Sequence, residues 1–149
     1  MSKTISYRGQ LTDGISEKIS LATLNGKTGY KIKKFQIIDP TPGQSDVELV
    51  AKIYNKDPAT SSVAAGTVDF TESSLMAISF YTFERGNIGT SFQSIFDNEM
   101  TNQDIFLTAT DSTAGTKSTN YYLELETVAL TDLQSTQITL KSLRTIASR

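Results

Sequence analysis

The sequence predicts an all-β protein, a single antiparallel β-sandwich domain that spans residues 1–149. Apolar and polar residues alternate with period two along most of the chain, which is the pattern of half-buried strands. Turn-forming residues separate these runs, and no helical run of 10–15 residues lies between them, which excludes parallel βαβ units. Ser and Thr fill 38 of the 149 positions, and both favour strands, turns and wet surfaces over helix interiors.

The first two predicted strands cover residues 15–21 and 30–37, with the turn Asn25-Gly26 between them. In the second run the apolar residues change parity at positions 33–34. A regular strand would turn half of these residues to the wrong face, so we expect a β-bulge there.

Four further segments follow in the middle of the chain. Residues 47–54 alternate most clearly, and residues 68–70 suggest a short strand. Residues 75–83 are apolar on both faces, which is typical of a central strand buried on both sides. Residues 91–100 fit either a helical stripe or a short strand, and we favour the strand.

The last predicted strands cover residues 105–111, 120–130 and 138–146. The total is eight to ten strands, and a number near eight makes a jelly roll the leading topology. Strand spacing alone leaves other Greek-key arrangements open.

Composition removes several classes of chemistry. The chain contains no Cys, His or Trp, so a thiol nucleophile, a histidine base, a zinc finger and a disulfide framework are excluded. A serine hydrolase would need a lysine base, and no fitting Ser-x-x-Lys motif is present. We expect no enzymatic activity and no cofactor.

Charge and hydropathy limit the kinds of partner that the protein can bind. The net charge of -2 supplies no broad basic surface for nucleic acid. No stretch approaches the ~20 apolar residues of a membrane span, and the first residues lack a signal-peptide pattern. We therefore expect synthesis and assembly in a cytoplasm, with neither nucleic acid nor membrane as a partner.

Two pairs of carboxylates have the spacing of a glycosidase pair, Glu124 with Glu126 and Asp97 with Glu99. Side chains at i and i+2 on a strand lie about 6–7 Å apart. Alternating Glu is also how a sheet keeps one face in water, and we favour that interpretation.

A second group combines carboxylates and amides, which are ligands that Ca²⁺ accepts. Its members are Asp97, Asn98, Glu99, Asn102 and Asp104. Their spacing lacks the glycine and the ligand order of an EF-hand loop, so turn formation is the favoured interpretation and no metal is predicted.

Three tyrosines are candidate protein-interface residues: Tyr54, Tyr81 and Tyr122. Their parity is compatible with positions opposite the main apolar stripe, where a tyrosine supplies contact area at little entropic cost. The alternative is that they belong to a second buried face of the sandwich.

Four segments resemble a known group of proteins. They are residues 21–32 (LATLNGKTGYKI), 95–107 (IFDNEMTNQDIFL), 120–126 (NYYLELE) and 140–146 (LKSLRTI). Together they resemble small virion structural proteins of marine tailed bacteriophages, including those that infect cyanobacteria. The segments cover less than half of the chain, and none of them is a catalytic signature.

The resemblance implies a β-sandwich protein of the phage particle, and specifically a capsid decoration or cement protein. Its partners would be the major capsid protein and copies of itself, with a trimer as one arrangement. The alternative is a receptor- or glycan-binding module of a tail fibre or baseplate.

Overall fold

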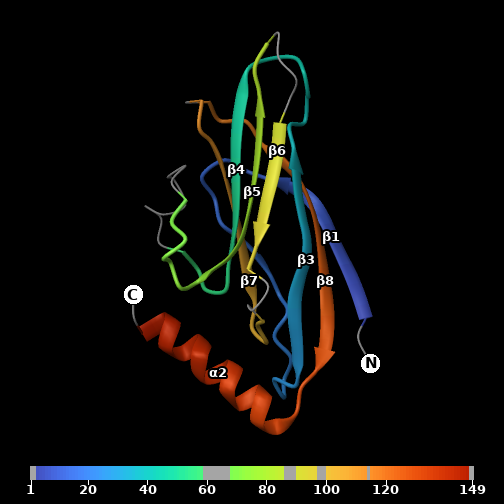
Figure 1. Cartoon of the computed structure of the whole chain (residues 1–149), viewed down its shortest axis with the longest axis vertical. Coiled ribbons are helices and arrows are strands. Elements are labelled where there is room, and N and C mark those ends of the chain that lie inside the picture. The colour runs from blue at the N-terminus through green and yellow to red at the C-terminus, as the bar shows by residue number, and fades with distance from the viewer. Residues whose placement is uncertain (1–2, 59–67, 86–89, 97–99, 114, 148–149) are drawn as a thin grey trace.

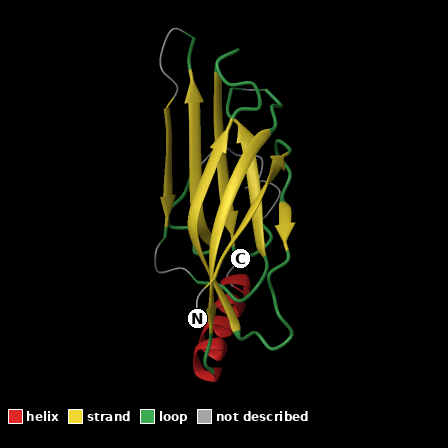
Figure 2. Ribbon diagram, turned by 90° about the vertical axis from the view of Figure 1, so that its right-hand side faces the viewer, coloured by secondary structure: helices red, strands yellow, loops and turns green. Residues whose placement is uncertain are grey.

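The computed structural model of the chain describes residues 3–58, 68–85, 90–96, 100–113 and 115–147. Within these ranges it places eight strands in two antiparallel sheets that pack face to face, with one helix across an end of the sandwich (Figures 1 and 2). The predicted all-β sandwich of about eight strands is therefore confirmed.

The smaller sheet has three strands in the order β1-β8-β3. Their bounds are Lys3–Leu11 for β1, Thr119–Ala129 for β8 and Thr28–Ile38 for β3. The predicted bulge is confirmed, because the register of β3 against β8 shifts between Ile32 and Lys34. Strand β1 was not predicted, although Ile5 and Tyr7 alternate with polar neighbours.

The larger sheet has five strands in the order β2-β7-β4-β5-β6. Their bounds are Glu17–Ile19, Ile105–Asp111, Val47–Tyr54, Leu75–Phe83 and Thr90–Ile95, in that order. Strand β6 confirms the preference for a strand in the first half of residues 91–100, and residues 97–99 lie outside the described part of the chain. The predicted strand at residues 68–70 is wrong, because residues 68–69 are irregular and residue 70 begins a turn.

The strand pairing is that of a jelly roll with one pair left open. A jelly roll arises when a long antiparallel ribbon folds over, so that strands 1 and 8, 2 and 7, 3 and 6, and 4 and 5 pair. Here β1–β8, β2–β7 and β4–β5 form hydrogen-bonded ladders, whereas β6 pairs with β5 and β3 pairs with β8. Strands β3 and β6 consequently end their sheets side by side.

The core lies between the two sheets and is built by the inward-facing side chains of both. Phe35 and Leu123 of the small sheet and Leu49, Ile53 and Leu107 of the large sheet are fully buried there. Large-to-small changes at such positions cost about 2–5 kcal/mol, so this layer holds the sheets together.

Residues 138–146 form no strand, and that prediction is wrong. They belong to helix α2, Asp132–Ala147. The helix begins with a capping box, in which the Gln134 amide N–H donates to Thr131 Oγ1 over 3.2 Å and the Thr131 amide N–H donates to Gln134 Oε1 over 3.0 Å. The apolar residues of this stretch break the strand period because they follow a helical one.

Candidate interaction groove between β3 and β6

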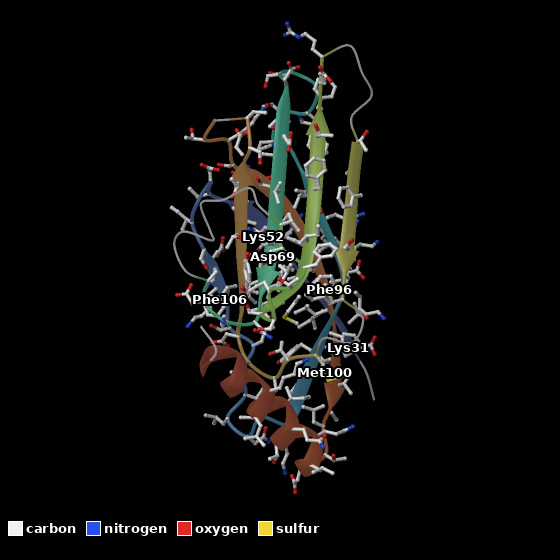
Figure 3. All side chains as sticks on the ribbon, turned by 60° about the vertical axis from the view of Figure 1, so that its left-hand side comes forward. Lys31, Lys52, Asp69, Phe96, Met100 and Phe106 are labelled. Carbon is white, nitrogen blue, oxygen red and sulfur yellow. The ribbon has the colours of Figure 1, made fainter. Side chains whose placement is uncertain are left out.

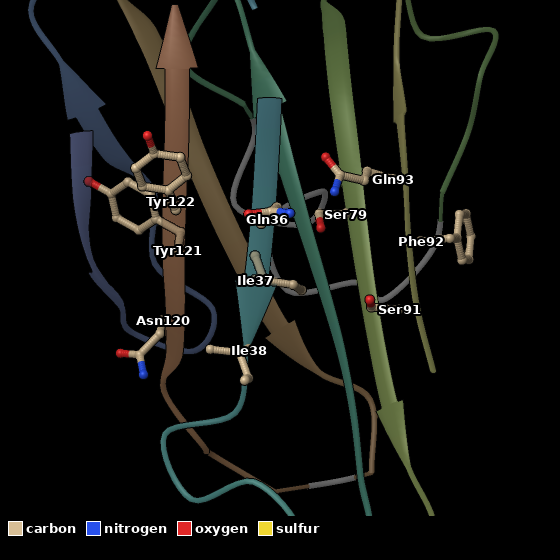
Figure 4. A pocket seen from close by; sticks show the side chains of 10 residues that line it. All are labelled: Gln36, Ile37, Ile38, Ser79, Ser91, Phe92, Gln93, Asn120, Tyr121 and Tyr122. Atoms are coloured by element: carbon tan, nitrogen blue, oxygen red, sulfur yellow. The ribbon is translucent and has the colours of Figure 1, made fainter. Parts of the chain in front are cut away.

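A groove with a volume of ≈ 360 Å³ lies where β3 and β6 face each other at the open side of the sandwich (Figure 4). Strands β3 and β8 line one side, with Ile38 and Tyr122, and β6 lines the other, with Ser91 and Gln93, while the ring of Phe92 points away from the groove. Its polar lining consists mainly of amides from Gln36, Gln93 and Asn120. The groove therefore combines apolar side chains on its β3–β8 side with amide and hydroxyl groups on its β6 side.

The groove exists because the pairing of β3 with a further strand is incomplete. At the lower end, Tyr30 and Thr101 exchange two backbone hydrogen bonds, over 2.8 and 3.1 Å. Further up, the Phe35 amide N–H donates to the side-chain Oε1 of Gln93 over 3.2 Å. A side-chain amide of β6 thus occupies the place that a backbone carbonyl would take in a continuous sheet. Beyond Phe35, at Ile37 and Ile38, the strand edge borders the groove.

Among the large apolar side chains that the described surface exposes, Ile38 and Tyr122 lie on one side of the groove, and Phe92 lies on the outer face of β6 next to it. The exposed fractions are 46% for Ile38, 51% for Phe92 and 37% for Tyr122. Phe92 also packs on Phe80 across the strand pair, with ring centroids 5.4 Å apart. Exposed apolar groups beside a concave site, as Ile38 and Tyr122 are here, are typical of a surface that another molecule covers.

Tyr122 is the one predicted interface tyrosine that reaches this groove. It lies on the outer face of the small sheet, and its hydroxyl donates to the Glu124 carboxylate, which raises the pKa of Tyr122 above its ordinary value of 10.0. The phenol therefore stays neutral, and its hydroxyl is engaged on the outer face of the small sheet.

The other two predicted tyrosines lie elsewhere. Tyr81 is half-buried and packs against the main core, so the expected outward position is wrong for this ring. Its partner across the strand pair is the fully buried Leu49, and the two side chains share the inner face.

Tyr54 faces outward from β4 but is only 5% exposed, because it belongs to a second, smaller apolar cluster. This cluster contains Leu75, Ile78, Phe96 and Phe106, and Figure 3 shows the last two on either side of Lys52. Burial, followed by the carboxylates of Glu72 and Asp69, raises the pKa of Tyr54 to about 12. The alternative of a second buried face is therefore confirmed for Tyr54.

Glu124 and Glu126, one of the two candidate glycosidase pairs, each form an exposed ion pair with a lysine. Glu124 Oε2 lies 3.7 Å from Lys34 Nζ, and Glu126 Oε2 lies 3.5 Å from Lys33 Nζ. These contacts cross from β8 to β3 on the outer face of the small sheet. The favoured interpretation, a strand face kept in water by alternating Glu, agrees with this placement. Asp97 and Glu99 lie outside the described residues.

Asp104 and Asn102 are the candidate calcium ligands that the structure describes, and both form hydrogen bonds with the backbone of the connection between β2 and β3. Asp104 Oδ1 accepts from the amides of Leu21 and Ala22 over 2.8 and 2.9 Å, and the Asn102 amide donates to the carbonyl of Gly26 over 3.0 Å. Across the part of the chain that the structure describes, no group of three or more potential metal-ligating side chains is found. Asp97, Asn98 and Glu99 are not among the residues described.

Sequence reasoning missed Ile38 and Phe92 as members of the groove. A local signal was present, because Ile37 and Ile38 are consecutive and a strand cannot bury both on one face. The sequence could not indicate that Phe92 borders the groove, because this depends on which strand β6 pairs with.

Comparison with known proteins assigns the chain to no family, because neither a protein-family model nor a curated protein matches it. None of the helical residues that the structure describes makes a span long and apolar enough to cross a membrane.

Proposed function

We propose that this protein is a structural component of a tailed-phage particle, a capsid decoration protein that stabilises the capsid through protein–protein contacts. The observation that supports this proposal is the β3–β6 groove, where the exposed side chains of Ile38 and Tyr122 lie beside a strand edge. Its proposed partners are the major capsid protein and further copies of the chain.

The groove suits an extended segment of a partner protein. A segment lying along β3 would pair with its backbone edge near Ile37, as in the addition of a strand to a sheet. Its side chains would cover Ile38 and Tyr122, and the amides of Gln36 and Asn120 would satisfy its remaining polar groups.

A second candidate is a receptor- or glycan-binding module of a tail fibre or baseplate. The observation that favours it is the same lining, since aromatic rings beside amide groups also suit a sugar. A glycan would contact Tyr122 and Asn120 without using the backbone edge of β3.

The first experiment is mass spectrometry of purified particles produced from the genome that encodes this chain, together with electron microscopy of particles that carry a labelled copy. The proposal expects the chain in the particle and the label over the capsid shell. Absence of the chain from the particle would contradict the proposal, and a label at the tail would support the fibre or baseplate alternative instead.

The second experiment tests the groove with matched variants. Ile38→Lys places a charge on the β3–β8 side of the groove, and Ile15→Lys is its control, because Ile15 is a comparably exposed isoleucine on the connection between β1 and β2. We expect Ile38→Lys to weaken binding to capsids at least tenfold and Ile15→Lys to leave it unchanged. Equal binding by both variants would show that the groove is not the contact surface.

A further inference from the structure

The connection between β2 and β3 carries the one Asn-Gly pair of the sequence, Asn25-Gly26. Asn25 is exposed, and the proposed function uses neither residue. An asparagine before a glycine can lose its side-chain amide through attack by the backbone nitrogen of the glycine. Glycine permits this because it has no Cβ to block the approach and adopts the backbone angles that the reaction needs. Asn25 is therefore a candidate site of covalent modification.

The hydrogen bonds around Asn25 suit this attack. Asn25 Oδ1 accepts from the Lys27 amide N–H over 3.0 Å and from the Thr23 hydroxyl over 3.3 Å. The first contact is an Asx turn, which folds the Asn25 side chain back over the peptide bond to Gly26. Together the two donors polarise the side-chain carbonyl, and they lie where negative charge develops on Oδ1 when a nucleophile adds to Cγ.

The attacking nitrogen is weakly held. The Gly26 N–H donates to the Thr23 carbonyl over 3.2 Å, at the long end of the hydrogen-bond range. This bond has to open before the nitrogen can lose its proton. Because Gly26 is only partly buried, hydroxide reaches the N–H once the bond has opened.

We propose that Asn25 is a site of spontaneous deamidation, and that the product releases helix α2 from the sandwich. Hydroxide removes the proton from the Gly26 amide, and the nitrogen attacks Cγ of Asn25. The new N–Cγ bond forms while the Cγ–Nδ2 bond breaks, and Nδ2 leaves as ammonia after taking a proton from water, which regenerates hydroxide. Water then opens the resulting cyclic imide at one of its two carbonyls and gives aspartate or isoaspartate. The net reaction consumes one water and releases one ammonia.

Residues 26 and 27 hold the start of α2. The Gly26 carbonyl accepts from the Ser135 hydroxyl over 2.8 Å and from the Asn102 amide over 3.0 Å. Lys27 Nζ lies 2.9 Å from Oδ1 of Asp132 in the first turn of the helix. None of the described helical side chains belongs to the main core cluster, so the described part of α2 depends on polar contacts of this kind for its attachment.

Isoaspartate breaks these contacts because it lengthens the main chain. Its backbone runs through the side-chain carboxyl carbon, which inserts one methylene between residues 25 and 26. The site has little free space, since a Cβ added to Gly26 would already lie 3.2 Å from Asn102 Nδ2 and 3.3 Å from Ser135 Oγ. The Gly26 carbonyl therefore loses its alignment with both donors. Because this inference uses no residue of the groove, it holds or fails independently of the proposed function.

The first measurement follows the modification in the full chain during incubation at mildly alkaline pH. Peptide mass spectrometry locates each deamidated asparagine, and labelling by an isoaspartyl methyltransferase measures isoaspartate. We expect deamidation at Asn25 to be at least tenfold faster than at Asn102, which is completely buried. Thr23→Val removes one donor to Oδ1 and should slow the reaction at Asn25 at least threefold.

Hydrogen exchange measures the release of α2. Ion exchange separates the deamidated fraction from the unmodified chain by its added negative charge. We expect amide exchange in α2 to be at least tenfold faster in this fraction, with exchange in β4 and β5 unchanged. Freshly purified Asn25→Asp is the matched control, because it carries the same charge on a normal backbone and should leave exchange in α2 within about twofold of the wild type.

The chemistry and the release of the helix can fail separately. An intact Asn25 after prolonged incubation, or an unchanged rate in Thr23→Val, contradicts the assigned reaction. Isoaspartate at residue 25 with unchanged exchange in α2, or equally fast exchange in Asn25→Asp, contradicts release by the altered backbone.

Discussion

The ammonium group of Lys117 lies 2.8 Å from Oδ2 of Asp39, whose side chain is completely buried. Asp39 follows β3, and Lys117 precedes β8, so the ion pair joins two loops at the end of the sandwich opposite α2. The other oxygen of Asp39 accepts from the Thr41 amide over 3.0 Å. The buried Asp39 carboxylate therefore connects the two loops that flank the upper end of the groove.

Removal of Lys117 should destabilise the protein, because it leaves the Asp39 carboxylate buried without its cation. We expect Lys117→Met to lower the free energy of unfolding by about 2–3 kcal/mol in urea denaturation. Lys18→Met breaks the exposed pair with Asp104, which is 3.8 Å long, and should change stability by no more than about 0.5 kcal/mol. Adding Asp39→Asn to Lys117→Met should recover part of the loss, and additive effects would contradict the coupling.

Asp104 should make stability depend on acid pH. The hydrogen bond from the Ala22 amide lowers the pKa of Asp104 below 3.8, partial burial opposes this, and the Leu21 amide and Lys18 lower it further. Because the pKa is lower in the folded state, the stabilisation is complete well above pH 3.8 and is lost as the pH falls through the folded value.

The matched variant is Asp104→Asn, which keeps an oxygen acceptor for the same two amides. We expect it to be about 1 kcal/mol less stable than the wild type near neutral pH, because hydrogen bonds to a charged acceptor are stronger. The difference should shrink as the pH falls below 3.8 and the Asp104 carboxylate becomes protonated. A difference that stays constant with pH would exclude the carboxylate charge as its source.

Tyr54 should contribute to the loss of stability at alkaline pH. Its pKa is about 12 in the folded protein, against an ordinary value of 10.0, with burial as the main cause. The stabilisation is present below pH 10.0 and is lost as the pH rises through about 12. We expect Tyr54→Phe to reduce the loss over this range by about 2 kcal/mol. The exposed Tyr122→Phe should reduce it less, and an unchanged slope in Tyr54→Phe would contradict the effect of burial.

The capping box should control the local stability of α2. Thr131→Ala removes the acceptor for the Gln134 amide and should cost the helix about 1 kcal/mol. None of the described helical side chains belongs to the main core cluster, so the change should appear as about fivefold faster amide exchange in α2. Gln137→Ala, an exposed interior position, should not accelerate exchange. Loss of global stability without faster exchange in α2 would contradict this picture.

The sequence by itself determined which faces of the strands are buried. Period-two alternation placed β3, β4, β7 and β8, a run apolar on both faces placed β5, and the change of parity at positions 33–34 indicated the bulge. These features were readable because a strand turns successive side chains to opposite faces. The start of α2 was also encoded locally, in Thr131 and Gln134, but the apolar residues near the C-terminus were interpreted as a strand.

Only the tertiary structure decided how the strand edges are used. Whether β6 pairs with β5 or with β3 depends on contacts between distant segments, and alternation is the same in both cases. That choice places Gln93 of β6 across from β3 and opens the groove beside Ile38 and Tyr122. It also separates Tyr54 and Tyr81 from Tyr122, because parity assigns a face of one sheet but not what covers that face.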